Sequence, residues 1–245
     1  MSKMLIEFFR GLAILIGYFA IDVVGMLALR KYVPMPTEVF RKLLHLILLC
    51  TVFIWLYAFE TWWLSALAAN AFAAMVYPIL MAVERLPIFS GVFAKLFVER
   101  NAGEFRRSLM VVSLMFAILI CVCWGLLGER YLVLAAVMGW GIGDGAAALV
   151  GKRFGKRFLM GRMIEGRKSV EGSAAMFTCA FVSVAAVLLG YQAAPWYACL
   201  TIALVTAVVL AVVELYTRRG MDTITCPLAA VATMMPLIYL WNGVL

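Results

Sequence analysis

The chain has 245 residues, of which 66% are hydrophobic and only 14% are charged, and its formal net charge is +8. Soluble globular chains are about 45–50% apolar and about 25% charged, so this composition excludes a soluble protein. It predicts one integral-membrane domain that occupies residues 1–245. In a soluble protein a net charge of +8 would suggest nucleic acid binding. Here membrane topology explains this charge, and we expect no nucleic acid partner.

Apolar runs of the length that crosses a bilayer, about 20 residues, recur along the whole chain. They predict an all-α, polytopic bundle of about eight transmembrane helices, at residues 12–29, 43–59, 62–83, 108–127, 131–150, 173–189, 196–216 and 223–241. The first run lacks a signal-peptidase site and contains Asp22, so we interpret it as a helix and not as a signal peptide. In the last run, Pro227 is expected in the first turn and Pro236 at a kink or at the helix end. Residues 88–98 are apolar but too short to span, which favours an interfacial or re-entrant helix.

Lys and Arg are distributed unevenly over the connections between these runs. Of the 21 basic residues, 18 fall in the first, third, fifth and seventh connections. Because basic loops stay cytoplasmic, these connections should face the cytoplasm and both termini should face outward. This pattern explains the net charge.

Residues 139–172 combine an intramembrane acid with a basic loop. Asp144 lies among four alternating glycines (139, 141, 143 and 145) within a predicted span. A small-residue helix-packing face would explain the glycines but not the acid, because intramembrane carboxylates are costly and usually functional. Seven cations follow in residues 152–168, and glycines among them can turn backbone N–H groups toward an anion. The same charges could instead be an ordinary positive-inside loop against lipid headgroups.

The end of this loop carries three groups suited to a metal-bound phosphate. Lys168 supplies a cation, Ser169 a hydroxyl that can also cap the following helix, and Glu171 an oxygen ligand for Mg²⁺. Asp222, at the start of the last run, could bind metal, cap its helix, or do both. Glu214 is expected simply to pair with Arg218 one turn later.

A second basic group lies on the second predicted helix. Arg41 and His45 share one helix face, beside Lys42, although a lone histidine is often only structural. The charge pattern places this group, Asp144, Glu171 and Asp222 on the cytoplasmic side. Three acids and many cations on one side suit a nucleoside triphosphate with Mg²⁺.

These motifs resemble the signature of the CTP-dependent polyprenol kinase family, which includes dolichol kinase, phytol kinase and CTP-dependent diacylglycerol kinase. The central matches are Gly143-Asp144, Gly151-Lys152, Gly155, Lys168-Ser169 and Glu171-Gly172; the flanking ones are Arg41-Lys42 with His45, and Asp222-Thr223-x-Thr225-x-Pro227. Thr223 stands where the family commonly has asparagine. The resemblance covers residues 41 to 227 and implies a helical membrane enzyme.

The resemblance implies transfer of the γ-phosphate of CTP to the hydroxyl of a membrane lipid alcohol, with Mg²⁺. Asp144 would position or deprotonate the hydroxyl, and Asp144, Glu171 and Asp222 would bind the metal. Contacts with the nucleotide and its phosphates are expected from Arg41, Lys42, His45, Gly151, Lys152, Arg153, Lys168, Ser169 and Gly172. The location expected is a prokaryotic cytoplasmic membrane.

Two other functions remain open at this stage. A phosphatidate cytidylyltransferase would use the same CTP but release pyrophosphate, and the long acidic, glycine-rich stretch expected late in its sequence is missing. A transporter of an anionic solute would place its site near mid-membrane and usually contain an internal repeat, whereas the polar residues here gather at one face. Which lipid alcohol is the acceptor does not follow from the residues.

Overall fold

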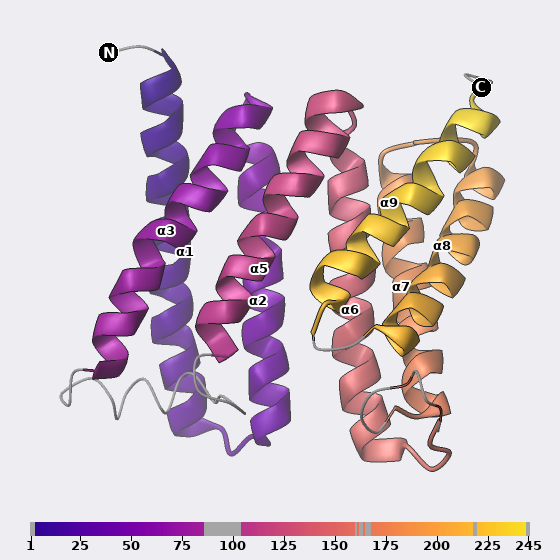
Figure 1. Cartoon of the computed structure of the whole chain (residues 1–245), viewed down its shortest axis with the longest axis horizontal. Helices are drawn as coiled ribbons and strands as arrows, with labels where there is room; N and C mark the ends of the chain where they lie inside the picture. The colour runs from indigo at the N-terminus through magenta and orange to yellow at the C-terminus, as the bar shows by residue number, and fades with distance from the viewer. Residues whose placement is uncertain are drawn as a thin grey trace. The chain divides into compact units, whose positions relative to one another are not determined.

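The computed structural model describes residues 3–85, 104–159, 161, 164, 168–217 and 220–243. Its order of elements is α1 (Lys3–Tyr32), α2 (Thr37–Tyr57), α3 (Trp62–Arg85), α5 (Glu104–Leu119), the π-helix η1 (Ile120–Leu126), α6 (Arg130–Phe154), α7 (Val170–Gly190), α8 (Trp196–Tyr216) and α9 (Asp222–Trp241) (Figure 1). Eight helical segments in this described part are long and apolar enough to cross a membrane. The predicted all-helical membrane fold is therefore confirmed.

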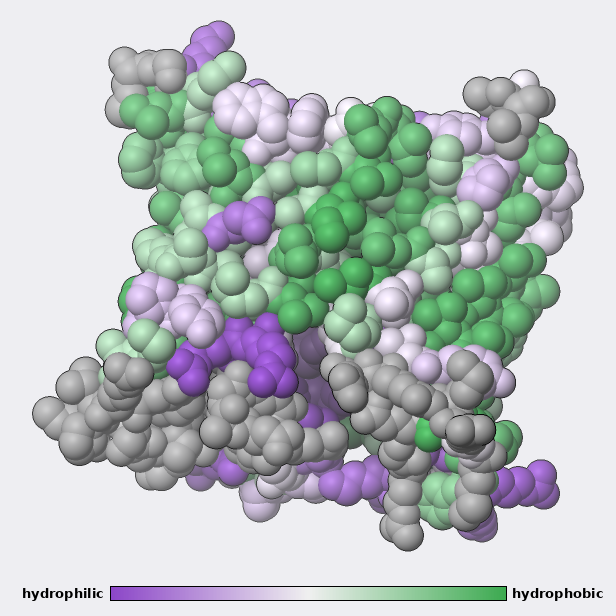
Figure 2. All heavy atoms as spheres, viewed as in Figure 1, coloured by the Kyte–Doolittle hydropathy of each residue, from purple (hydrophilic) through white to green (hydrophobic). Residues whose placement is uncertain are grey.

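Hydrophobic side chains cover much of the helix surface, as a membrane requires. Figure 2 shows them over most of the face in view, with most of the strongly hydrophilic residues near the lower ends of the helices. The protein is thus a multi-pass membrane protein. The segment 88–98, expected to form an interfacial or re-entrant helix, lies outside the described residues.

One prediction about the last helix is wrong. Because α9 begins at Asp222, Pro227 falls in its second turn and not in its first. The helix also continues past Pro236 to Trp241. Prolines are tolerated inside membrane helices because neighbouring groups and local adjustment satisfy the backbone acceptors that they leave.

The helices form two compact units that divide at residue 121. In the first unit α1 packs on α2 and α3, and α3 packs on α5. In the second unit α6 to α9 pack on one another, with the broadest contact between α6 and α7. The expected single domain stays a prediction.

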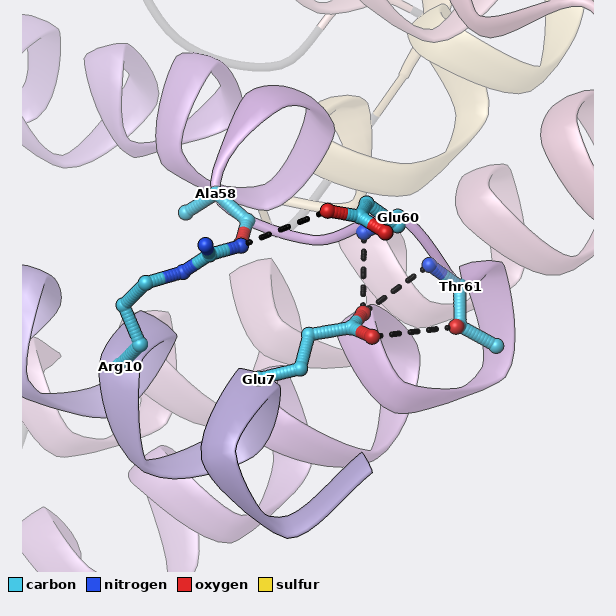
Figure 3. A network of polar contacts seen from close by, with 5 residues as sticks. All are labelled: Glu7, Arg10, Ala58, Glu60 and Thr61. Carbon is cyan, nitrogen blue, oxygen red and sulfur yellow. Dashed lines mark hydrogen bonds and ion pairs between the residues drawn. The ribbon is translucent and has the colours of Figure 1, made fainter. Parts of the chain in front are cut away.

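A polar clamp fixes α1 within the first unit. The Glu7 carboxylate accepts hydrogen bonds from the backbone N–H groups of Glu60 and Thr61 at 2.9 and 3.0 Å, and Arg10 donates one to the carbonyl of Ala58 at 3.2 Å (Figure 3). Thr61 directly precedes α3, so Glu7 supplies from another helix the acceptor that the glutamate of a capping box gives to the N–H before a helix. One turn later, Gly11 lies so close to Phe59 that a Cβ would be 2.2 Å from its ring. The start of α1 is therefore fitted to the turn between α2 and α3.

Small residues recur every four positions along the face of α6 that meets α7. A Cβ added to Gly139 would lie 2.7 Å from Val184 Cγ2, and one added to Gly143 would lie 2.5 Å from Met176 Sδ. Side chains four apart share a helix face, and small ones let membrane helices approach closely. The packing interpretation therefore accounts for Gly139 and Gly143. It does not account for Gly145, where a Cβ would meet nothing within 4 Å.

Candidate active site

The two ends of the basic loop between α6 and α7 are joined by backbone hydrogen bonds. Phe158 and Ser169 form an isolated antiparallel bridge. The N–H of Leu159 donates to the carbonyl of Lys168 at 2.8 Å, and the N–H of Val170 donates to that of Arg157 at 2.9 Å. The bridge holds the start of the loop against the first turn of α7.

Ser169 is buried at this junction, with 3% of its surface exposed. As predicted, it caps a helix: its Oγ accepts a hydrogen bond from the N–H of Gly172 at 3.1 Å, at the start of α7. Three motif glycines surround this hydroxyl. A Cβ on Gly151, Gly155 or Gly172 would approach the Oγ to 3.2, 2.9 and 3.2 Å. These glycines make room for Ser169, while the phosphate contacts expected of Gly151, Ser169 and Gly172 stay predictions.

Glu171 contacts the same loop. Both of its carboxylate oxygens lie 3.4 Å from the backbone nitrogen of Arg157, which donates to them. Within the structure Glu171 therefore ties the loop to α7. Its predicted role as a metal ligand is a separate matter and stays a prediction.

Three carboxylates from three helices lie within electrostatic range of one buried thiol in the second unit. Cys226 on α9 is fully buried, and Asp144, Glu214 and Asp222 are all close enough to interact with it electrostatically. Asp144 comes from α6 and Glu214 from the last turn of α8. Asp222 is the first residue of α9, whose N-cap position is Met221, so Asp222 is not the N-cap. The fold thus places Asp144 and Asp222 both within electrostatic range of Cys226.

Lys168 joins this acidic group through an ion pair that the sequence did not reveal. Its Nζ lies 2.9 Å from the Glu214 carboxylate and also donates to the Glu214 backbone carbonyl. The partner of Glu214 is therefore a loop lysine; Arg218, the partner expected, lies outside the described residues. Nearby, the Thr217 and Thr225 hydroxyls are 3.1 Å apart and connect the end of α8 to α9.

The remaining cations of the predicted site occupy two helices. Lys152 and Arg153 are exposed in the last turn of α6, where positive charge also complements the helix dipole. Arg41 lies in the first unit, on α2, and pairs with Glu38 at 3.0 Å. Sequence reasoning missed Glu38, although its place three residues before Arg41 is a signal of such a pair.

Arg41, Lys42 and His45 are all half-buried on α2. They belong to the first unit, whereas Asp144 and its neighbours belong to the second. Their meeting in one site stays a prediction.

The acids suit a metal ion that arrives with its ligand. In the part of the chain that the structure describes, no three His, Cys, Asp or Glu side chains are placed to hold a metal. Mg²⁺ is usually bound through one or two carboxylates plus water and substrate phosphates, not in an all-protein cage. Asp144 and Asp222 near the same thiol fit that donor set.

Comparison with known proteins adds one relative. No family model matches the chain, and no solved structure matches it. It is 30% identical over 214 residues to the phytol kinase of Synechocystis sp. (strain ATCC 27184 / PCC 6803 / Kazusa), a match that covers 85% of this chain and 83% of the relative. With the motifs and the helical membrane fold, this similarity shows that the chain belongs to the polyprenol and phytol kinase family.

Proposed function

We propose that the protein is a membrane lipid-alcohol kinase, which transfers the γ-phosphate of CTP, bound with Mg²⁺, to the hydroxyl of a polyprenol, a phytol-like alcohol or diacylglycerol. The similarity to a phytol kinase over 85% of the chain carries the proposal. CTP as donor and Mg²⁺ rest on the resemblance of the motifs. The site faces the cytoplasm of a prokaryotic cell, the side that holds the nucleotide.

The cations at the end of α6 and in the loop between α6 and α7 suit the triphosphate. Lys152 and Arg153 are exposed at the end of α6, and Lys168 lies in the loop two residues before α7. Phosphoryl transfer depends mainly on positioning and on stabilising charge, so a loop fixed at both ends is the kind of support that it needs. The bridge of Phe158 to Ser169 and the contact of Glu171 with Arg157 provide that support.

The carboxylates suit the metal and the acceptor. Asp144 and Asp222 would hold the Mg²⁺ of the nucleotide, with Glu171 as a third candidate ligand. When bound, the ion would neutralise charge on the phosphates. Asp144 lies ten residues before the end of α6, a depth of about 15 Å along the helix. A lipid hydroxyl could meet a carboxylate there while its tail stays among apolar helices.

A direct assay tests the proposal. The protein, purified and reconstituted in lipid nanodiscs, is given γ-labelled CTP, Mg²⁺ and a panel of lipid alcohols, and labelled lipid phosphate is expected. Asp144→Asn should lower the rate at least a hundredfold, as expected for a residue that positions or deprotonates the hydroxyl. Asp22→Asn, the same change in another membrane helix, is the matched control. Release of pyrophosphate in place of lipid phosphorylation would refute the proposed kinase activity. Full activity of Asp144→Asn would refute the role proposed for Asp144.

The metal roles are separated by Mg²⁺ titration. If Asp222 binds the ion, Asp222→Asn should raise the Mg²⁺ concentration needed for half-maximal activity. Glu171→Gln should do the same if Glu171 is a ligand. If Glu171 only supports the loop, Glu171→Gln should change the KM for CTP and leave the Mg²⁺ requirement as in the wild type.

A further inference from the structure

The ammonium of Lys168 is held at the point where α8 ends. Its Nζ contacts both the side chain and the backbone carbonyl of Glu214. Glu214 lies two residues before the last residue of α8, Tyr216, so its carbonyl is one of the last four that the helix itself leaves unsatisfied. The negative end of the helix dipole adds to the attraction.

This contact is sheltered from solvent. The side chains of Lys168 and Glu214 are 21% and 13% exposed. Partly buried ion pairs are screened much less than exposed ones. The backbone of Lys168 is also fixed, because its carbonyl accepts the hydrogen bond from Leu159 and Ser169 follows it in the bridge. The lysine is therefore held at both ends of a side chain that otherwise has many rotamers.

We propose that Glu214 is a positioning residue that holds Lys168 ready to meet the nucleotide phosphates. The inference rests on the proposed function. Glu214, Asp144 and Asp222 all act electrostatically on Cys226, so the contact keeps a cation in the same region as the two acids proposed to hold Mg²⁺. Without the carboxylate, Lys168 would have to be ordered when the nucleotide binds, and that ordering reduces affinity.

Kinetics with one conservative series tests this role. Glu214→Gln should raise the KM for CTP about tenfold, roughly the effect of losing one hydrogen bond to a charged group, with kcat changed less than about twofold. Glu214→Asp keeps the charge and should restore part of the loss. Glu129→Gln is the matched control, because Glu129 lies at the N-cap of α6, at the other end of that helix from the basic loop. A KM for CTP that is unchanged or lower in Glu214→Gln overturns the inference, since a lower value means that Glu214 competes with the phosphates.

A double-variant cycle shows whether Glu214 acts through Lys168. In a Lys168→Met background, Glu214→Gln should raise the KM for CTP no further, whereas independent effects that multiply contradict the proposal.

Acetylation of the Lys168 amine by acetic anhydride, followed by mass spectrometry, gives a readout besides activity. The acetylation should be slow in the wild type and faster in Glu214→Gln. Equal acetylation rates would show that the carboxylate does not hold the amine. Failure of the wild type to bind CTP or phosphorylate any lipid would overturn the proposed function and this inference together, whereas an active wild type with unaffected variants overturns the inference alone.

Discussion

Replacing Gly155 with alanine should destabilise the junction between α6 and α7 more than the addition of one methyl group suggests. The added methyl group would lie 2.3 Å from the carbonyl oxygen of Gly151, 2.9 Å from Ser169 Oγ and 3.1 Å from Ser169 Cβ. All three distances are too short for carbon contacts, and the first is to backbone. The bridge of Phe158 to Ser169 limits how far the loop can move away.

Two costs follow from that crowding. Overpacking a well-packed site costs about 1–3 kcal/mol. Displacing Ser169 would also weaken its hydrogen bond to the N–H of Gly172, and losing a serine cap costs about 1 kcal/mol. We therefore expect Gly155→Ala to lower the free energy of unfolding by about 2–4 kcal/mol. Gly145→Ala is the matched control, because its methyl group meets nothing within 4 Å and alanine favours a helix over glycine by up to about 1 kcal/mol.

Unfolding by SDS in mixed micelles, followed by circular dichroism, measures both variants against the wild type. Ser169→Ala, which removes the cap without crowding, should fall between them. If Gly155→Ala unfolds like Gly145→Ala, the close fit of the three glycines around Ser169 is not what constrains these positions, and the explanation given for Gly151, Gly155 and Gly172 is wrong.

Two further predictions concern the first unit and the orientation of the chain. Glu7→Ala should lower the free energy of unfolding by about 1–2 kcal/mol in the same assay, because two backbone donors lose their acceptor; Glu60→Gln, whose ion pair with Arg10 is 3.9 Å long and exposed, should change it by less than about 0.5 kcal/mol. For orientation, single cysteines are placed at Lys156 and Glu60 in a cysteine-free background and treated with an impermeant maleimide on intact cells. The cysteine at 60 should react and the one at 156 should not, and the opposite pattern would overturn the orientation proposed from the basic loops.

The fold was predictable because its main signal is local. A run of about twenty apolar residues indicates a membrane helix without knowledge of its neighbours. The ends of the helices were less predictable, because helices continue into polar residues beyond the apolar core. For example, α1 begins at Lys3 and α6 ends at Phe154, both outside the predicted runs. The position of Pro227 was misjudged for another reason: even from the predicted start at residue 223 it is the fifth residue, which lies beyond a first turn of 3.6 residues.

The site was predictable in its parts but not in its contacts. Motif spacing identified Asp144, Ser169 and Asp222 as candidates, and the capping role of Ser169 is confirmed. The pair of Lys168 and Glu214 joins residues 46 apart in the sequence, and no local spacing predicts such a contact. The glycines around Asp144 were open to two interpretations, a helix-packing face and a functional site. Only the distances to neighbouring atoms separate Gly143, which packs on Met176, from Gly145, which has no such neighbour.

The length of α1 links the protein to the thickness of its membrane. With 30 residues the helix is about 45 Å long, whereas the hydrocarbon core is about 30 Å thick. The helix would have to tilt by about 48° to fit wholly within the hydrocarbon core, which is beyond the usual range of about 0–40°. One end of α1 should therefore project from the core. The clamp of Glu7 and Arg10 lies in the first turns of α1, where such a projection keeps it in the polar interface. A thicker bilayer would draw these charges into hydrocarbon, so lipids with longer chains should destabilise the first unit before they affect the second.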